Sequence, residues 1–293
     1  MNNQKMSEPV GILNKDYFQN NFTLNTYFPK NHLQDYIEHY WLISWELPFG
    51  VSHQQDVIPH PNTHLTFLNN DSHIQGICKQ KYSHTLSESG NIVGVKFKPA
   101  GFFSFAERAG VTLSSITDKV LDIKSVFNIN DDLTDVEQRI LKLDTATDKI
   151  NYVDQLLFSN SLNVGENIKP DENIKTLNAI VADIAINKDL IKVTDVSGKY
   201  KIELRHLQRL FLKYIGVSVK WVINRYRMHE ALTTVESYDP VIDSAQSPDW
   251  AKLALELGYY DQAHFIKDFK SIMGTTPKEH YSQLSSKKLL SSN

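Results

Sequence analysis

The stretch that decides the fold of the C-terminal part is 250–281, WAKLALELGYYDQAHFIKDFKSIMGTTPKEHY. Its first segment carries alanine and leucine at helical spacing. Gly258 follows, where the end of a helix favours a residue that accepts a positive φ. Asp261 stands where an N-cap is expected, so a second helix should begin at Gln262. The stretch therefore predicts a helix, a tight turn and a second helix.

The second predicted helix has one apolar face. Phe265, Phe269 and Ile272 repeat at i, i+4 and i+7, while polar side chains occupy the other faces. Gly274 should end this helix and Pro277 should open a further short one. Two interpretations fit: a segment of a small helical bundle with solubilising polar residues, or a helix-turn-helix whose second helix enters a DNA major groove. Periodicity alone does not separate them.

A pattern of fixed spacings favours the second interpretation. The run LALELGYYDQAHFIKDFKSIMGTTP resembles the second helix-turn-helix of AraC/XylS-type transcriptional regulators, with the pattern IA…GF…D.S.F.R.FK…G.TP. The matching residues are Leu253, Ala254, Gly258, Tyr259, Asp261, His264, Phe265, Phe269, Lys270, Gly274, Thr276 and Pro277. The chain departs from the family at Tyr259, Ala263 and Lys267, where Phe, Ser and Arg are usual.

A similar unit lies upstream in 201–220, KIELRHLQRLFLKYIGVSVK. This run resembles the first helix-turn-helix of the same family, with the pattern S…L.R.F….G.S. The matching residues are Leu207, Arg209, Phe211, Gly216 and Ser218. Glu203 stands near the usual Ser, which leaves the start of this helix open. Two units of one architecture, in the family's order, reinforce each other.

The segments between the two units set their separation. Residues 219–235 are expected to form one long helix, and 236–250, ESYDPVIDSAQSPDW, a loop. Major-groove faces on one side of B-DNA recur about every 34 Å, so two reading helices need a rigid connector. Upstream, the residues from 174 to 187 and from 190 to 198 are predicted as helices, with Gly198 ending the second.

The resemblance implies which side chains contact DNA. Base-contact candidates are Arg205, Gln208 and Arg209 in the first unit and Gln262, Ala263, His264 and Lys267 in the second. Arg can form two hydrogen bonds to guanine and Gln two to adenine, so these residue types suit base reading. Phosphate-contact candidates are Lys199, Lys201, Lys213, Arg227 and Lys270.

Residues 22–110 form short apolar or alternating runs separated by Gly, Pro, Asn and Ser, which predicts a β-sandwich or small barrel. In 93–98, Val93, Val95 and Phe97 alternate with Gly94 and two lysines, Lys96 and Lys98, that should face solvent. The segment 32–41, HLQDYIEHYW, is interpreted as a short helix, and 112–157 as helical. The fold class is therefore α+β with two domains: a β-rich N-terminal domain with helices, and an all-α domain of two helix-turn-helix units joined by a long helix.

Three N-terminal segments resemble the β-rich domain of one subset of AraC-like regulators, a domain whose function is generally unassigned. They are NHLQDYIEHYW, VIPHPNTHLTF and NIVGVKFKPAGFFSF, within residues 25–125.

Candidate pocket residues in this domain are Trp41, Trp45, His64 and Phe67, which could line an effector site or simply fill the core. A metal site at His53, His60 and His64 is disfavoured, because no carboxylate completes the set. We expect no metal, no cofactor and no catalytic residue.

Composition bounds the remaining choices. A length of 293 residues suggests about two domains, and we place them at 1–158 and 174–285 with a polar linker at 159–173. One cysteine, Cys78, excludes an intrachain disulfide and fits a reducing compartment. With no signal-peptide pattern and no long apolar run, we expect a cytoplasmic protein that makes no membrane contact.

Charge is unevenly distributed. Residues 1–170 carry 14 Lys and Arg against 19 Asp and Glu, whereas 171–293 carry 17 against 15, so the basic excess lies in the helical part. Within 199–213 five basic residues accompany one acid, a local cluster suited to phosphate.

The leading prediction is a sequence-specific DNA-binding transcriptional regulator that reads two successive major grooves and is controlled by its N-terminal domain. Its predicted partner is double-stranded promoter DNA; a small-molecule effector, RNA polymerase and a second copy of the chain stay open. One alternative is a ligand- or protein-binding module with vestigial DNA contacts. The other, less favoured, is an enzyme with an appended helical domain.

Overall fold

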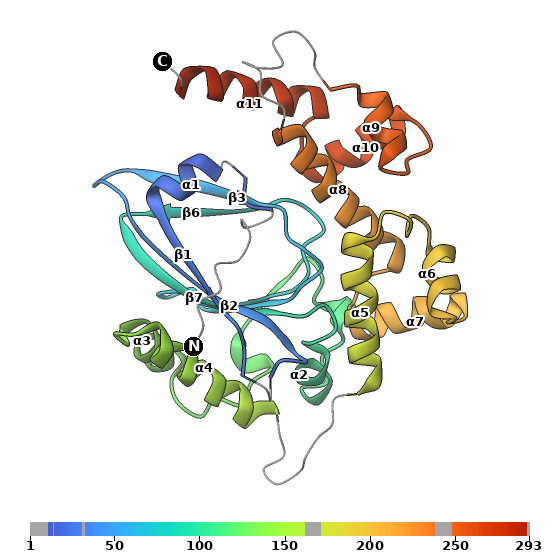
Figure 1. Cartoon of the computed structure of the whole chain (residues 1–293). Helices are drawn as coiled ribbons and strands as arrows, with labels where there is room; N and C mark the ends of the chain where they lie inside the picture. The colour runs from blue at the N-terminus through green and yellow to red at the C-terminus, as the bar shows by residue number, and fades with distance from the viewer. Residues whose placement is uncertain (1–10, 14, 31–32, 162–170, 238–247, 292–293) are drawn as a thin grey trace.

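The computed structural model describes residues 11–13, 15–30, 33–161, 171–237 and 248–291. A β-rich N-terminal part is followed by a helical C-terminal part, so the predicted two-domain α+β architecture is confirmed (Figure 1). Across these described ranges, no helix combines the length and the apolar character needed to cross a membrane.

The N-terminal part contains eight strands and short helices among the described residues. The strands are β1 Phe22–Tyr27, β2 Ile37–Glu46, β3 Ser52–Val57, β4 His64–Phe67, β5 His73–Gln75, β6 Tyr82–Ser87, β7 Ser89–Phe97 and β8 Val120–Leu121. The α-helices are α1 Lys15–Asn21, α2 Phe103–Arg108, α3 Leu133–Lys142 and α4 Ala146–Ser161, with 3-10 turns η1 Leu113–Ser115 and η2 Ile123–Ser125.

The strands form a six-stranded sheet in the order β1-β2-β7-β4-β5-β8 and a separate β3–β6 pair, with every pairing antiparallel. One face of the large sheet packs against α2, α3 and α4 through Val93, Val95 and Phe97, as their alternation predicted. The opposite face packs Trp45 and Ile92 against Leu86 of the β3–β6 pair. The sheet is therefore buried on both sides.

Two glycines of β7 let indole rings lie flat on the face of the large sheet that packs against the β3–β6 pair, which we call the inner face. Gly94 pairs with Trp41 and Gly90 with Trp45 across the β2–β7 register. A Cβ at position 94 would come within 1.9 Å of the Trp41 ring, and one at position 90 within 2.4 Å of the Trp45 ring. The glycines thus provide the space that the two rings fill.

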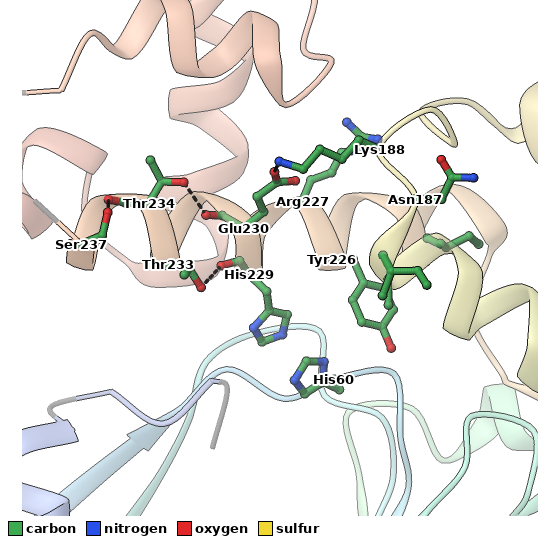
Figure 2. A pocket seen from close by; sticks show the side chains of 13 residues that line it. His60, Asn187, Lys188, Tyr226, Arg227, His229, Glu230, Thr233, Thr234 and Ser237 are labelled. Atoms are coloured by element: carbon green, nitrogen blue, oxygen red, sulfur yellow. Dashed lines mark hydrogen bonds and ion pairs between the residues drawn. The ribbon is translucent and has the colours of Figure 1, made fainter. Parts of the chain in front are cut away.

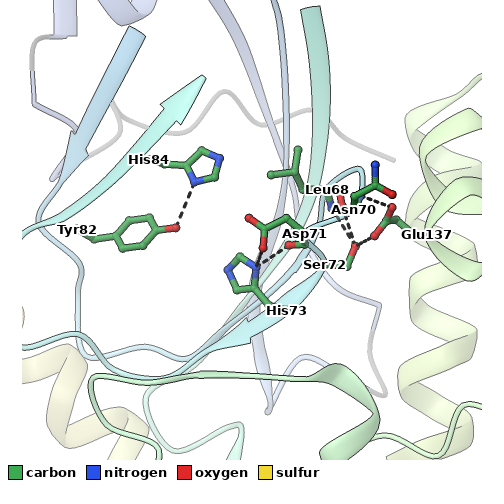
Figure 3. A network of polar contacts seen from close by, with 8 residues as sticks. All are labelled: Leu68, Asn70, Asp71, Ser72, His73, Tyr82, His84 and Glu137. Carbon is green, nitrogen blue, oxygen red and sulfur yellow. Dashed lines mark hydrogen bonds and ion pairs between the residues drawn. The ribbon is translucent and has the colours of Figure 1, made fainter. Parts of the chain in front are cut away.

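A buried carboxylate ties the β4–β5 turn to α3. Glu137 accepts hydrogen bonds of 2.6 Å from the Asn70 backbone N–H and from the Ser72 hydroxyl (Figure 3). Beside this turn, Nδ1 of His73 lies 2.6 Å from the Asp71 carbonyl oxygen. These side-chain hydrogen bonds add to the three residue pairs that connect β4 and β5.

The C-terminal part contains seven α-helices in the described ranges. They are α5 Glu172–Ile186, α6 Val193–Tyr200, α7 Leu204–Tyr214, α8 Val219–Ser237, α9 Trp250–Glu256, α10 Gln262–Met273 and α11 Pro277–Ser291. Helices α6 and α7 form the first predicted unit, α9 and α10 the second, and α8 is the predicted long connector. Asp261 caps α10, and Gly258 and Gly274 have φ of +76° and +79°, so the expected turns are confirmed.

Three local predictions are wrong. The second half of 32–41 is strand, because Ile37 begins β2, and its alternating side chains face two buried layers. Gly198 does not end α6, which continues to Tyr200 and is terminated by Lys201 in the left-handed region at φ +52°. The stretch 112–157 is only partly helical, since η1, β8 and η2 precede α3. The loop at 236–250 and the linker at 159–173 lie largely outside the described residues.

Helix α8 contributes to two hydrophobic cores. Its first half, with Val219 and Val222, belongs to the main core that also includes the β-rich part. Its second half, with Met228, Leu232 and Val235, packs in a second core with α9, α10 and α11. One continuous helix therefore joins the two helix-turn-helix units (Figure 1).

The N-terminal part packs closely on the first unit at the end of α7. The Phe103 and Tyr214 rings are 4.1 Å apart. Gly216 has φ +91°, and a Cβ there would lie 2.7 Å from the Leu113 carbonyl group. The Thr117 hydroxyl donates to the Gly216 carbonyl at 3.3 Å. Close approach and a positive φ both require glycine at position 216.

A buried arginine makes a second connection between the parts. Arg225 of α8 is 1% exposed and donates to the carbonyl oxygens of Cys78, at 3.3 Å, and Lys79, at 2.6 Å. Its guanidinium lies 4.7 Å from the centre of the Trp221 ring. Burial lowers the Arg225 pKa to about 10, so the side chain stays charged at neutral pH. Further along, the Lys81 N–H donates to the Ile272 carbonyl of α10 at 3.3 Å.

We predict unequal costs for two glycine substitutions with similar backbone strain. Gly274→Ala should destabilise the chain by about 1–2 kcal/mol, because its φ is +79° and a Cβ there meets nothing within 4 Å. Gly216→Ala should cost clearly more, because the added Cβ also collides with Leu113. Urea unfolding of both variants measures the difference, and equal costs would show that the contact at Leu113 adjusts freely.

Candidate nucleic-acid interface

Helix α7 separates a buried stripe from an exposed polar face. The Glu203 carboxylate caps it by accepting the His206 N–H at 2.9 Å, which places the start of the helix that the sequence left open. Leu207, Leu210, Phe211 and Tyr214 are buried. The three predicted base-contact residues of this unit, Arg205, Gln208 and Arg209, are all exposed. Their outward position leaves them accessible to a groove.

Helix α10 repeats this arrangement. Its N-cap, Asp261, accepts the His264 N–H at 2.8 Å, while Phe265, Phe269 and Met273 are buried. The four predicted base-contact residues, Gln262, Ala263, His264 and Lys267, are exposed. Each predicted set is therefore exposed on its own helix.

The predicted phosphate contacts occupy different surroundings. Lys201 and Lys270 are exposed near the ends of α6 and α10. Lys199 lies 2.6 Å from the Asp183 carboxylate. Lys213 lies 3.7 Å from Glu107 of α2 and over the Phe103 ring. The first two lysines are thus the better placed for DNA, because the other two already have acidic partners.

Arg227, a predicted phosphate contact, is turned towards the protein. Its guanidinium is half-buried and donates to the carbonyl oxygens of Leu257 and, at 3.3 Å, Leu190. These carbonyls belong to the end of α9 and to the segment before α6. Arg227 therefore connects the second unit to the first from within the protein, and partners so distant in sequence leave no local signal of this role.

A groove of about 270 Å³ lies between the two units, and the sequence analysis missed it. The segment before α6, the exposed face of α8 and the start of α10 line it, with Lys192, Lys220, Asn224, Tyr260 and His264 among its residues. Tyr260 is 89% exposed. The sequence did contain a signal for an exposed Tyr260. Of the adjacent Tyr259 and Tyr260, only Tyr259 fits the apolar pattern.

His206 was also missed. It is exposed on α7, and its Nδ1 lies 2.9 Å from a guanidinium nitrogen of Arg209. It therefore orients one of the base-contact candidates. Its position one turn before Arg209 on the same helix face was a usable signal.

The four effector-pocket candidates do not form one site. Trp41 and His64 lie on the inner face of the large sheet, with ring centres 6.3 Å apart, and Trp45 is buried further along that face. Phe67 lies on the opposite face, in the main core. Side chains alternate along a strand, so Thr66 shares the face of His64 and Phe67 points the other way. The prediction of a pocket shared by all four is therefore wrong.

The inner face carries buried charge where solvent was expected. Lys96 has a side chain 14% exposed and bonds the Glu38 carboxylate at 2.8 Å, so the prediction that it is solvated is wrong. Burial, with Lys96 nearby, lowers the pKa of His64 to about 3 and that of His39 to about 4. Both imidazoles are therefore neutral at physiological pH.

Comparison with known proteins identifies both domains. Residues 196–283 match the family model described as "Helix-turn-helix domain", and residues 25–122 match "Domain of unknown function (DUF6597)". No curated protein matches.

Several solved structures of ToxT from Vibrio cholerae are similar in part. An apo variant is 16% identical, with a TM-score of 0.33 over 84% of this chain and 97% of that one. The P21 crystal form is 14% identical, with a TM-score of 0.32 over 89% and 98%. A form bound to an unsaturated fatty acid is 16% identical, with a TM-score of 0.30 over 89% and 95%. These TM-scores are low, so the assignment depends on the family matches and on the geometry.

Two helix-turn-helix units on one connecting helix define a DNA-binding transcriptional regulator. The matched helix-turn-helix domain follows a matched domain of unknown function, which is the order that the resemblance to AraC/XylS-type regulators implies.

The buried histidines predict a loss of stability in mild acid. His64 has a folded-state pKa of about 3 against an ordinary value of 6.5, so below pH 6.5 only the unfolded chain takes up its proton. The free energy of unfolding should keep its full His64-dependent part above pH 6.5. Between pH 6.5 and pH 3 it should fall by about 1.4 kcal/mol per pH unit on account of His64. His39 adds to this effect for the same reason.

Urea unfolding as a function of pH measures this slope. His64→Gln should reduce it, whereas His206→Gln, at an exposed position of α7, should leave it unchanged. An identical slope in the wild-type chain and the His64 variant would contradict the prediction.

Proposed function

We propose that the chain binds promoter DNA by inserting α7 and α10 into two successive major grooves. The observation that carries this proposal is that both helices bury their apolar stripe and leave every base-contact candidate exposed. Helix α8 supports it, because successive grooves about 34 Å apart require two units held at a constant separation.

Within this proposal the exposed residues have different roles. Arg205 and Arg209 read guanine through paired hydrogen bonds, and Gln208 and Gln262 read adenine. Ala263 offers a small apolar surface to a thymine methyl group. His264 and Lys267 complete the second reading face. Lys199, Lys201, Lys213 and Lys270 contact phosphates, which fix register and carry no sequence information directly.

The groove between the two units accommodates the DNA backbone between the two major grooves. Lys192 and Lys220 supply positive charge there, and Asn224 and Tyr260 supply hydrogen-bonding groups. This position fits a phosphate strand because the groove separates the two reading helices.

The N-terminal domain controls this activity in our proposal. It contacts the first unit at Gly216, the connector at Arg225 and the second unit at Ile272, so a change in its packing reaches both units. Regulation by a small-molecule effector, contact with RNA polymerase and formation of a homodimer stay predictions, as does a cytoplasmic location. The matched helix-turn-helix domain supports a role in transcription regulation, and the absence of catalysis stays part of our proposal.

We also propose the domain boundaries at 1–158 and 174–285. Helix α4 ends at Ser161 and α5 begins at Glu172, both within the proposed linker 159–173, and residues 162–170 lie outside the described residues. Both helices contribute to the main core, so the domains associate although separate segments build them.

The salt dependence of binding tests the DNA proposal. An operator obtained by selection from a random DNA library is titrated with the full chain at several salt concentrations. If about five to seven phosphates are neutralised, the slope of log affinity against log salt should be roughly −4 to −6. If the library yields no preferred sequence, or if the affinity does not change with salt, the proposed DNA-binding function is wrong.

Two substitutions separate base reading from phosphate contact. Arg209→Ala should cost on the order of 1–3 kcal/mol on the selected operator and relax the preference at one base pair. Lys201→Ala should weaken all sequences alike and reduce the salt slope by about one. Affinities on the selected operator and on single-base variants distinguish the two patterns. The same pattern from both variants would mean that α7 does not read bases.

A further inference from the structure

We propose that a cleft between the N-terminal domain and the connector helix α8 binds an uncharged ring compound with O–H or N–H donors on its edge. Regulation of DNA binding by this ligand rests on the proposed function, whereas the binding itself does not. The cleft has a volume of about 580 Å³, within the range of small-molecule sites. The C-terminal end of α5, the second half of α8 and His60 line it (Figure 2).

The floor of the cleft is aromatic. The imidazoles of His60 and His229 stack with ring centres 4.0 Å apart and planes within 10° of each other. The Tyr226 ring lies 5.6 Å from His60 (Figure 2). His60 comes from the segment between β3 and β4, while the other two rings come from α8. A flat ligand that stacks on this floor therefore touches both domains.

His229 has a buried, unsatisfied ring nitrogen beside the cleft. The residue is only 4% exposed, and its buried Nε2 has no hydrogen-bond partner among the described residues. Burial, with Arg225 nearby, lowers its pKa to about 3, so the ring is neutral. Its hydrogen bond to the Pro59 backbone leaves Nε2 as an acceptor.

The hydroxyl groups along α8 are also acceptors. Thr233 donates to the His229 carbonyl at 3.0 Å, and Thr234 to the Glu230 carbonyl at 2.9 Å. Ser237 donates to the Thr234 carbonyl at 2.7 Å. Each hydroxyl has one hydrogen, and that hydrogen is already used, so only lone pairs remain for a ligand. The wall therefore selects a molecule rich in donors.

The charges at the rim are compensated within the protein. Lys188 and Glu230 form an ion pair of 2.5 Å, and Arg227 is held by the carbonyl oxygens of Leu190 and Leu257. With these charges already paired, the cleft offers little uncompensated charge to a charged ligand. An uncharged ligand leaves them intact, which is why we assign the cleft to that class.

Such a ligand is placed to affect DNA binding. It would hold His60 of one domain against α8, the helix that carries both reading units. A ligand shifts a conformational equilibrium only by binding one state better, and this floor exists only while the two domains are packed together. Binding should therefore favour the packed arrangement.

The test uses the full chain with two kinds of probe, free monosaccharides and nucleosides, which share ring shape and donor groups. Thermal unfolding identifies a probe that raises Tm with concentration, and calorimetric titration gives its Kd. Thr233→Val and Thr234→Val should each weaken binding about fivefold, as expected for one lost hydrogen bond. Ser282→Ala removes a hydroxyl with the same i to i−4 bond on α11 and should leave Kd unchanged.

The outcomes separate the cleft from the DNA proposal. Failure of every probe to bind, or binding that neither threonine variant weakens, overturns the cleft assignment even if the chain binds its operator. Binding that depends on the threonines supports the cleft even if no operator is found, and in that case the proposed function fails alone. A bound probe that changes operator affinity in the wild-type chain but not in the Thr234 variant supports both.

Discussion

The structure depends on one helix that must satisfy two cores at once. Helix α8 places Val219 and Val222 in the core shared with the β-rich domain, and Met228 and Val235 in the core of the second helix-turn-helix unit. Its apolar residues are therefore spread around the helix, unlike those of α7 and α10, which form one stripe. Neither core can move along α8 without exposing the side chains of the other.

The β-rich domain packs against the helical part on this fixed framework. It approaches the helical part through the shared main core, where Phe103 contacts Tyr214, and through backbone contacts at Gly216, Arg225 and Ile272. Backbone carbonyls and N–H groups make these contacts specific in position while tolerating many side chains on the N-terminal side. The two domains are thus joined by hydrogen bonds to backbone groups as well as by hydrophobic burial.

The sequence predicts the elements whose signals are local. Asp261, Gly258 and Gly274 define the turns around α10, and the spacing of Leu207 and Phe211 gives the buried face of α7. From these, the exposed faces that carry the base-contact candidates follow directly.

The remaining features depend on partners far apart in the chain. Lys96 is buried because the sheet register brings Glu38 beside it, and Arg227 turns inward because the end of α9 returns to α8. Residues 37–41 read as helical until β7 and β1 supply neighbours on both sides. No spacing within a short window contains that information.

The guanidinium of Arg225 has a consequence for water. It has exchanged its hydration shell for two carbonyl oxygens, and its Nε and Nη1 atoms are buried without a partner among the described residues. Separating the domains would return water to all of these groups. The packed and separated arrangements therefore differ in the number of bound water molecules, so the activity of water itself acts on their balance. An osmolyte that is excluded from the protein surface would favour the packed form without touching any site.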